Sequence, residues 1–188
     1  NGTYVDRDGL LKTAELYNKV TYSQVLSSNT LSKGSVSDDD IVSPFKNNEK
    51  SLFIPDTTTN FHYIRFNASV TSGLVYTISV FLKADGSDAY NYALINTSSG
   101  KGSGKSGPIV NIKDAEKVGL YTNDYDTQID DFGNGWYRYS YQFTTSLTSV
   151  GIDVNLFPSN SIGSYLGDGV NGAYIFGAQL VEGTEPLD

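Results

Sequence analysis

The stretch Leu74–Lys83 (LVYTISVFLK) decides the fold, because its apolar residues fall on every second position. One row of the alternation is Leu74, Tyr76, Ile78, Val80 and Leu82; the other is Val75, Thr77, Ser79, Phe81 and Lys83. Successive side chains of a strand point to opposite faces, so a period of two predicts a β-strand with one face toward a core. The second row is then expected on the opposite face.

Three more segments alternate in the same way: the one that opens with Trp136 after Asn134-Gly135, Val150–Phe157 and Ala173–Glu182. In the last of these we expect Tyr174, Phe176, Ala178 and Leu180 to share a face. Weaker strands are expected at Ser51–Ile54, Phe61–Val70, Ala89–Asn96 and Ile109–Ile112. Eight or more half-buried strands predict an all-β protein, an antiparallel two-sheet β-sandwich of jelly-roll type.

A chain of 188 residues fits one sandwich domain. We expect residues 1–22 to form an N-terminal arm or lead-in, in which Gly9–Leu16 fits either a short helix or an extended segment, and residues 23–188 to form the sandwich. A polar loop is expected near Ser35–Ser43, with a turn at Ser43-Pro44. The Gly/Ser/Lys-rich stretch Asn96–Gly107 predicts a mobile surface loop.

The composition argues against several classes of partner. A net charge of −8 opposes binding to nucleic acid or an anionic membrane, and no apolar run is long enough to span a bilayer. A neutral polysaccharide would be indifferent to this charge, whereas an anionic one would need a local basic pocket. Without cysteine there is no disulfide or thiolate. The chain has no methionine and opens with Asn1-Gly2-Thr3, as expected of a piece of a longer polypeptide.

Catalytic and metal-binding patterns are sparse. His62 is the single histidine, which excludes a multi-histidine zinc site, and Gly104-Lys105-Ser106 ends like a phosphate-binding loop but is followed by Gly107-Pro108 where a helix should begin. Carboxylates gather at Asp38–Asp40 and between Asp124 and Asp131. The second group fails the EF-hand spacing. We expect no required cofactor, with structural calcium left open beside the alternative of solvated acidic loops.

The strand faces turned away from the core carry a mixture that suits sugars, which offer apolar C–H faces ringed by hydroxyls. The candidate carbohydrate-binding residues are Trp136, Arg138, Phe81, Lys83, Asp153, Asn155, Phe157 and Gln179. The alternative is structural: Trp136 packs at the sheet edge, Arg138 pairs with Asp153 across strands, and the aromatic residues serve the second sheet or an oligomer interface.

Several stretches resemble one family. They are Tyr4–Leu10, Tyr76–Ala84, Ile129–Arg138 (IDDFGNGWYR), Gly167–Gly169 and Gly172–Gly183 (GAYIFGAQLVEG). In this order they resemble the carbohydrate-binding jelly-roll domains of phage tail fibres and tailspikes, which are concanavalin-like and CBM4/9-like. The resemblance implies a virion location outside the cell, and host surface glycan and other virion subunits as partners. By analogy with other phage appendages it also suggests a homotrimer.

Three functions are compatible with these residues and with the resemblance. The first is a non-catalytic carbohydrate-binding module that recognises host surface glycan. The second is a structural virion protein, a spacer, decoration or oligomerisation module, without glycan binding. The third is a polysaccharide depolymerase that uses Asp153 with Asp130 or Asp131. Because the acid–base inventory is poor, we expect no enzymatic activity.

Overall fold

The computed structural model describes residues 2–5, 11–14, 17–45, 48–97, 107–121 and 126–187. Within these ranges the chain is built from strands, and the single-turn 3-10 helix η1 (Leu26–Ser28) is the one helical element. No helix of the described part is long and apolar enough to cross a membrane. The strands are β1 (Gly2–Val5), β2 (Leu11–Ala14), β3 (Thr30–Ser32), β4 (Gly34–Val42), β5 (Asn48–Pro55), β6 (Thr59–Asn60), β7 (His62–Ser69), β8 (Val75–Ala84), β9 (Tyr92–Thr97), β10 (Gly107–Asn111), β11 (Glu116–Tyr121), β12 (Thr127–Asp131), β13 (Tyr137–Thr144), β14 (Ser149–Phe157), β15 (Tyr165–Leu166) and β16 (Ala173–Glu182).

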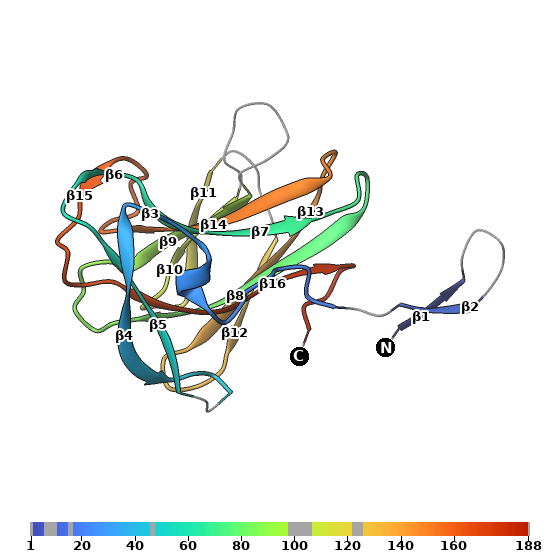
Figure 1. The fold of residues 1–188 in the computed structure, drawn as a ribbon, viewed down its shortest axis with the longest axis horizontal. Coiled ribbons are helices and arrows are strands. Elements are labelled where there is room, and N and C mark those ends of the chain that lie inside the picture. The colour runs from blue at the N-terminus through green and yellow to red at the C-terminus, as the bar shows by residue number, and fades with distance from the viewer. Residues whose placement is uncertain are drawn as a thin grey trace.

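Two six-stranded antiparallel sheets form the body (Figure 1). Sheet I has the order β11-β10-β9-β14-β7-β3, and sheet II has the order β12-β13-β8-β16-β5-β4. Their central strands, β10-β9-β14-β7 and β13-β8-β16-β5, have the order of a jelly roll, in which the chain repeatedly crosses from one sheet to the other. The predicted two-sheet β-sandwich of jelly-roll type is confirmed.

The core lies between the sheets and follows the predicted alternation closely. From β8 it takes Tyr76, Ile78, Val80 and Leu82, each fully buried. β14 contributes Val150, Ile152, Val154 and Leu156, and β13 contributes Tyr139, Tyr141 and Phe143. Burial of these side chains is the main favourable contribution to folding.

The prediction for β16 is wrong over its first half. Phe176 pairs with Phe81, but the next pair is Gln179 with Ser79, so β16 has one extra residue. Gly177 sits in this bulge with φ +57°, a left-handed conformation that suits glycine. The extra residue reverses the alternation: Ala173 and Ile175 face the core before the bulge, and Ala178 and Leu180 face it after. Tyr174 and Phe176 consequently pack on the other side of sheet II.

The loop predicted near Ser35–Ser43 is also wrong, because most of it is β4. This strand pairs with β5 at the edge of sheet II. An edge strand has solvent on one side, which accommodates the polar sequence that suggested a loop. Of the predicted mobile loop, Asn96 and Thr97 end β9 and Gly107 begins β10, and the rest lies outside the described residues.

The N-terminal part contains a β-hairpin and a segment that we call the lead-in segment, Tyr17–Thr21. The hairpin β1–β2 is extended rather than helical and stands apart from the sandwich (Figure 1). The lead-in segment lies along β16. Asn18 Nδ2 donates to the carbonyl of Ala178 at 3.0 Å, Lys19 N donates to that of Leu180 at 2.9 Å, and Leu180 N donates to Asn18 Oδ1 at 3.0 Å. These hydrogen bonds satisfy backbone groups of Ala178 and Leu180 on the edge of β16, beyond Tyr174, where the pairing of β16 with β5 has ended.

Candidate functional site

A groove of about 580 Å³ opens between the lead-in segment and the ends of β7 and β14. This volume lies within the range of small-ligand sites, about 300–1,000 Å³. The groove is lined by Tyr17, Lys19, Thr21, Asn67, Ala68, Ser69, Ser149, Val150 and Gly151. Three stretches far apart in the sequence therefore form the groove: the lead-in segment is its wall, and the ends of β7 and β14 are its floor.

The register of β7 and β14 sets the floor of the groove. Ser69 pairs with Ser149 and Asn67 pairs with Gly151. Because side chains alternate, Asn67, Ser69 and Ser149 point outward and are exposed, whereas Ala68 and Val150 belong to the core. The floor therefore presents an amide and two hydroxyl groups, which can both donate and accept hydrogen bonds.

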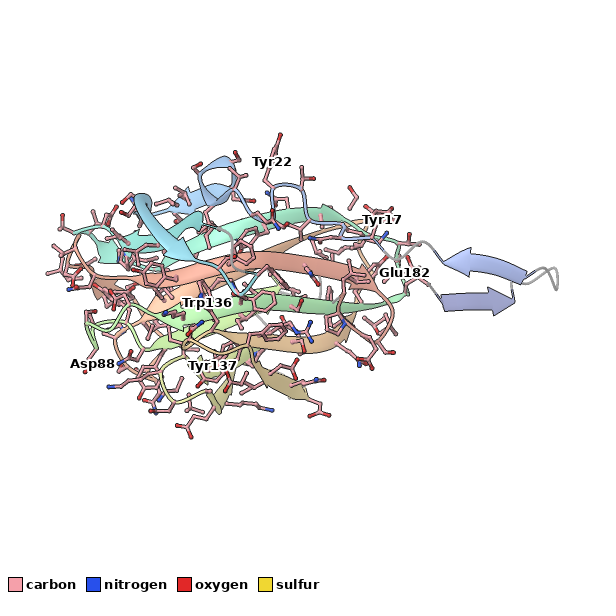
Figure 2. The ribbon with its side chains drawn as sticks, turned by 90° about the horizontal axis from the view of Figure 1, so that it is seen from below. Tyr17, Tyr22, Asp88, Trp136, Tyr137 and Glu182 are labelled. Carbon is pink, nitrogen blue, oxygen red and sulfur yellow. The ribbon has the colours of Figure 1, made fainter. Side chains whose placement is uncertain are left out.

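The lead-in segment supplies an aromatic ring and a cation. Tyr17 is 61% exposed. The Lys19 ammonium lies 4.7 Å from the centroid of the Tyr17 ring and 5.8 Å from that of Tyr76. It also lies 3.4 Å from the Tyr17 hydroxyl and 3.8 Å from a carboxylate oxygen of Glu182. Figure 2 shows Tyr17 and Glu182 at the end of the sandwich from which the hairpin extends.

Next to the groove, the outer face of sheet I carries an ion pair. Arg65 donates from Nε and Nη2 to the two carboxylate oxygens of Asp153, at 2.6 and 2.8 Å. Asp153 is fully buried, whereas the Arg65 side chain is 32% exposed and lies over the ring of Tyr63. The hydrogen bond with Asp153 raises the pKa of Arg65. This bidentate pair keeps the carboxylate satisfied beside the groove.

The eight residues predicted to bind carbohydrate lie on two opposite faces. Five of them belong to the outer side of sheet II: Trp136, Arg138, Phe81, Lys83 and Gln179. The other three belong to the outer side of sheet I: Asp153, Asn155 and Phe157. The core separates the two groups, so the structure does not bring the eight together into one site.

Within the sheet II group, the aromatic residues are packed away. Trp136 and Phe81 are each 1% exposed and cluster with Phe176. Phe157 is equally buried in the group on sheet I, against Leu94 and Ile109. None of the three predicted aromatic residues therefore offers a ring face to solvent.

The polar members of the set have protein partners or half-buried positions. Arg138 pairs with Asp130 at 3.0 Å and donates to the carbonyl of Leu187, so the expected alternative pairing with Asp153 is wrong. Gln179 Oε1 accepts from Ser79 Oγ and from Leu187 N, both at 3.2 Å. Lys83 is half-buried.

The carboxylates proposed for a depolymerase are not brought together. Asp130 and Asp131 lie on β12 in sheet II, whereas Asp153 lies on the outer side of sheet I and is bound by Arg65. Within the described ranges, no three or more His, Cys, Asp or Glu side chains gather to hold a metal. Structural calcium stays a prediction, and Asp124 lies outside the described residues.

Sequence reasoning missed every residue of the groove. Tyr17 and Lys19 precede the first alternating strand, and Asn67 lies on the outer face of a strand whose alternation is weak. No motif links the lead-in segment to the ends of β7 and β14. Only their contact in three dimensions reveals the groove.

Comparisons with known proteins give a structural likeness alone. No protein-family model matches the sequence, and no curated protein matches it. Among solved structures, a CBM4 structure aligns with TM-score 0.40 and 17% identity, over 85% of this chain and 81% of that one. TmCBM27, a carbohydrate-binding module with specific mannan recognition, aligns with TM-score 0.44 and 11% identity, over 91% of this chain and 97% of that one. Both TM-scores lie below 0.5.

Proposed function

We propose that the chain is a non-catalytic carbohydrate-binding module whose glycan lies in the groove beside the lead-in segment. One observation carries this proposal. The exposed ring of Tyr17 stands in a groove whose floor offers the uncharged hydrogen-bonding groups of Asn67, Ser69 and Ser149.

The chemistry of these groups suits a sugar. A tyrosine ring offers an apolar face for the C–H groups of a pyranose, and it loses little conformational entropy on binding. Hydroxyl and amide groups can exchange hydrogen bonds with sugar hydroxyls in either direction. No carboxylate lines the groove among the described residues, so the groove itself lacks the acid pair of a glycosidase.

The sharpest test uses Tyr17→Ala, with Tyr22→Ala as the matched control. Both tyrosines are exposed, at 61% and 57%, but Tyr22 does not line the groove (Figure 2). A fluorescent multimer of the full chain is applied to a glycan array, because single modules bind weakly. We expect Tyr17→Ala to lose most binding and Tyr22→Ala to keep it. Equal binding by both variants, or none by the unchanged chain, would refute the proposal.

We also propose that the module acts in a phage tail fibre or similar virion appendage. This rests on the sequence resemblance of Ile129–Arg138 and Gly172–Gly183 to domains of such proteins. The corresponding ligand is a host surface polysaccharide. Labelled multimers should stain host cells, and a host mutant that lacks its surface polysaccharide should lose the staining. Staining of both strains alike would argue against this role.

A structural role is the second candidate, favoured by two features. The hairpin β1–β2 pairs only with itself among the described strands, and an isolated two-stranded hairpin is marginally stable in water. In addition, Phe45 (45% exposed) and Phe132 (37% exposed) pack edge-to-face on Phe81, with ring centroids 5.4 and 4.8 Å away. If the hairpin or the Phe45 and Phe132 surface joins copies of the chain, light scattering should find an oligomer, such as the homotrimer that the resemblance suggests. A strict monomer at high concentration would exclude self-assembly.

A further inference from the structure

We infer that the ligand of the groove is an anionic glycan, whose carboxylate or sulfate group binds Lys19. This inference rests on the proposed function and specifies the class of sugar. Among the described residues that line the groove, Lys19 alone carries a charge. The chain as a whole has a net charge of −8, so this cation lies in a largely acidic molecule.

The position of Lys19 is fixed by its surroundings. Its backbone N–H donates to the carbonyl of Leu180, and its side chain is only 14% exposed. The rings of Tyr17 and Tyr76 lie within 4.7 and 5.8 Å of the ammonium. A lysine that is held in this way loses less conformational freedom when it binds an anion than a fully exposed lysine would.

Glu182 competes only weakly for this cation. Its carboxylate oxygen is 3.8 Å from the ammonium, which is longer than a hydrogen bond, and its side chain is 50% exposed. Glu182 does not line the groove. A sugar carboxylate or sulfate in the groove could therefore approach Lys19 closely while Glu182 turns toward solvent.

The net negative charge does not oppose this arrangement at short range. At physiological ionic strength, charges on a protein surface are screened beyond about 8 Å. The sugar anion would consequently respond to Lys19 rather than to the acidic residues elsewhere. Tyr17 and the hydroxyl groups of Ser69 and Ser149 would bind the uncharged part of the same sugar chain.

The test measures binding of the full chain to a glycan array that carries neutral, uronate, sialylated and sulfated glycans. We expect anionic glycans to bind best, and the carboxylated and sulfated sets show which anion is preferred. Chemical reduction of the carboxyl group, or removal of the sulfate, should weaken binding of the preferred glycan. Preference for neutral glycans would overturn the inference but leave the proposed function intact, provided that Tyr17→Ala still abolishes binding. Absence of all glycan binding would refute both.

Three variants test the role of Lys19 itself. Lys19→Gln should weaken binding of the anionic glycan about tenfold, the effect of one charge-assisted hydrogen bond, and should change binding of its neutralised form much less. Lys19→Arg keeps the charge and should retain most affinity. Glu182→Gln, at an exposed position, should strengthen binding only slightly, because Glu182 competes weakly for the Lys19 ammonium. If Lys19→Gln fails to fold, the unchanged chain still decides: equal affinity for the anionic glycan and for its neutralised form would contradict the inference.

Discussion

Asn155 donates a hydrogen bond from its side-chain amide to Oδ1 of Asn96, 2.8 Å away on the neighbouring strand, and both residues are fully buried. The pair leaves Nδ2 of Asn96 and Oδ1 of Asn155 without a partner among the described residues. Buried polar groups without hydrogen bonds are rare and costly. The two side-chain amides thus form one hydrogen bond with each other and leave two polar atoms unsatisfied on the outer side of sheet I.

The first prediction concerns this pair. Asn155→Val should lower the free energy of unfolding by about 1–3 kcal/mol, because it leaves the side-chain oxygen Oδ1 of Asn96 without its donor in the interior. Removing both amides in Asn96→Val/Asn155→Val should cost less than the sum of the single changes. Urea denaturation of the two single variants and the double variant measures this coupling. Strict additivity would show that the two side chains do not interact.

The ion pair beside the groove leads to a second prediction. Arg65→Met should destabilise the fold by about 3 kcal/mol, because it leaves the buried Asp153 carboxylate without its partner. Asp153→Asn should cost less, since the partly exposed Arg65 can turn toward water. Chemical denaturation at neutral pH gives both values. The reverse order would mean that Arg65, and not Asp153, is the group that burial penalises.

Alkaline pH should destabilise the protein through its buried tyrosines. Burial raises the pKa of Tyr139 above its ordinary value of 10.0, and it does the same for Tyr165. The folded state then holds the phenolic proton more tightly than the unfolded state, so stability is complete below pH 10 and falls above it. Thermal melting across this range should show the fall, and Tyr139→Phe should reduce it. A flat profile to high pH would contradict the expectation.

Acid should act through Asp168. Burial alone would raise its pKa, but hydrogen bonds from Val170 and Asn171 outweigh that effect and the pKa lies below the ordinary 3.8. Its contribution to stability is therefore present above pH 3.8 and is lost as the pH falls through the lower, folded value. Asp168→Asn should lose less stability than the unchanged chain over this acidic range. Identical profiles of stability against pH for the two proteins would show that the Asp168 carboxylate does not contribute to acid-sensitive stability.

The bulge in β16 gives a fifth prediction. Gly177→Ala should destabilise the fold by about 1–2 kcal/mol, because an L-residue is strained at φ +57°. Its Cβ would also lie 3.2 Å from Phe81 Cδ2. Gly73→Ala is the control, since Gly73 has φ +85° with no atom within 4 Å of the added Cβ. Urea denaturation measures the loss of unfolding free energy in each variant. A larger loss in Gly177→Ala than in Gly73→Ala is the expected effect of the contact with Phe81, and equal losses would contradict it.

The sandwich was predictable because its central strands have one buried and one outward face. In β8, the alternation of Tyr76, Ile78, Val80 and Leu82 alone places the core. β16 could not be predicted in the same way, because a single left-handed glycine reverses the alternation midway. β4 was missed because an edge strand can be as polar as a loop.

The candidate site could not be predicted from local patterns. Trp136 and Phe81 alternate with core residues, so they were expected at the surface, but they are buried in a second cluster outside sheet II. Whether an outward face meets solvent depends on what packs over it, and here Phe45 and Phe132 lie on Phe81. The groove depends on the lead-in segment, whose contacts with β16 span about 160 positions of the sequence.

The lead-in segment, one wall of the groove, is attached to the sandwich near β16 by the hydrogen bonds of Asn18 and Lys19. A ligand that contacts both the lead-in segment and the floor of the groove binds only while this segment stays attached. By mass action, each tenfold rise in ligand above its dissociation constant adds about 1.4 kcal/mol to the work of detaching the segment. Glycan binding would therefore hold the lead-in segment against the sandwich. Proteolysis near Tyr17 should slow as the fraction of groove sites that hold glycan rises.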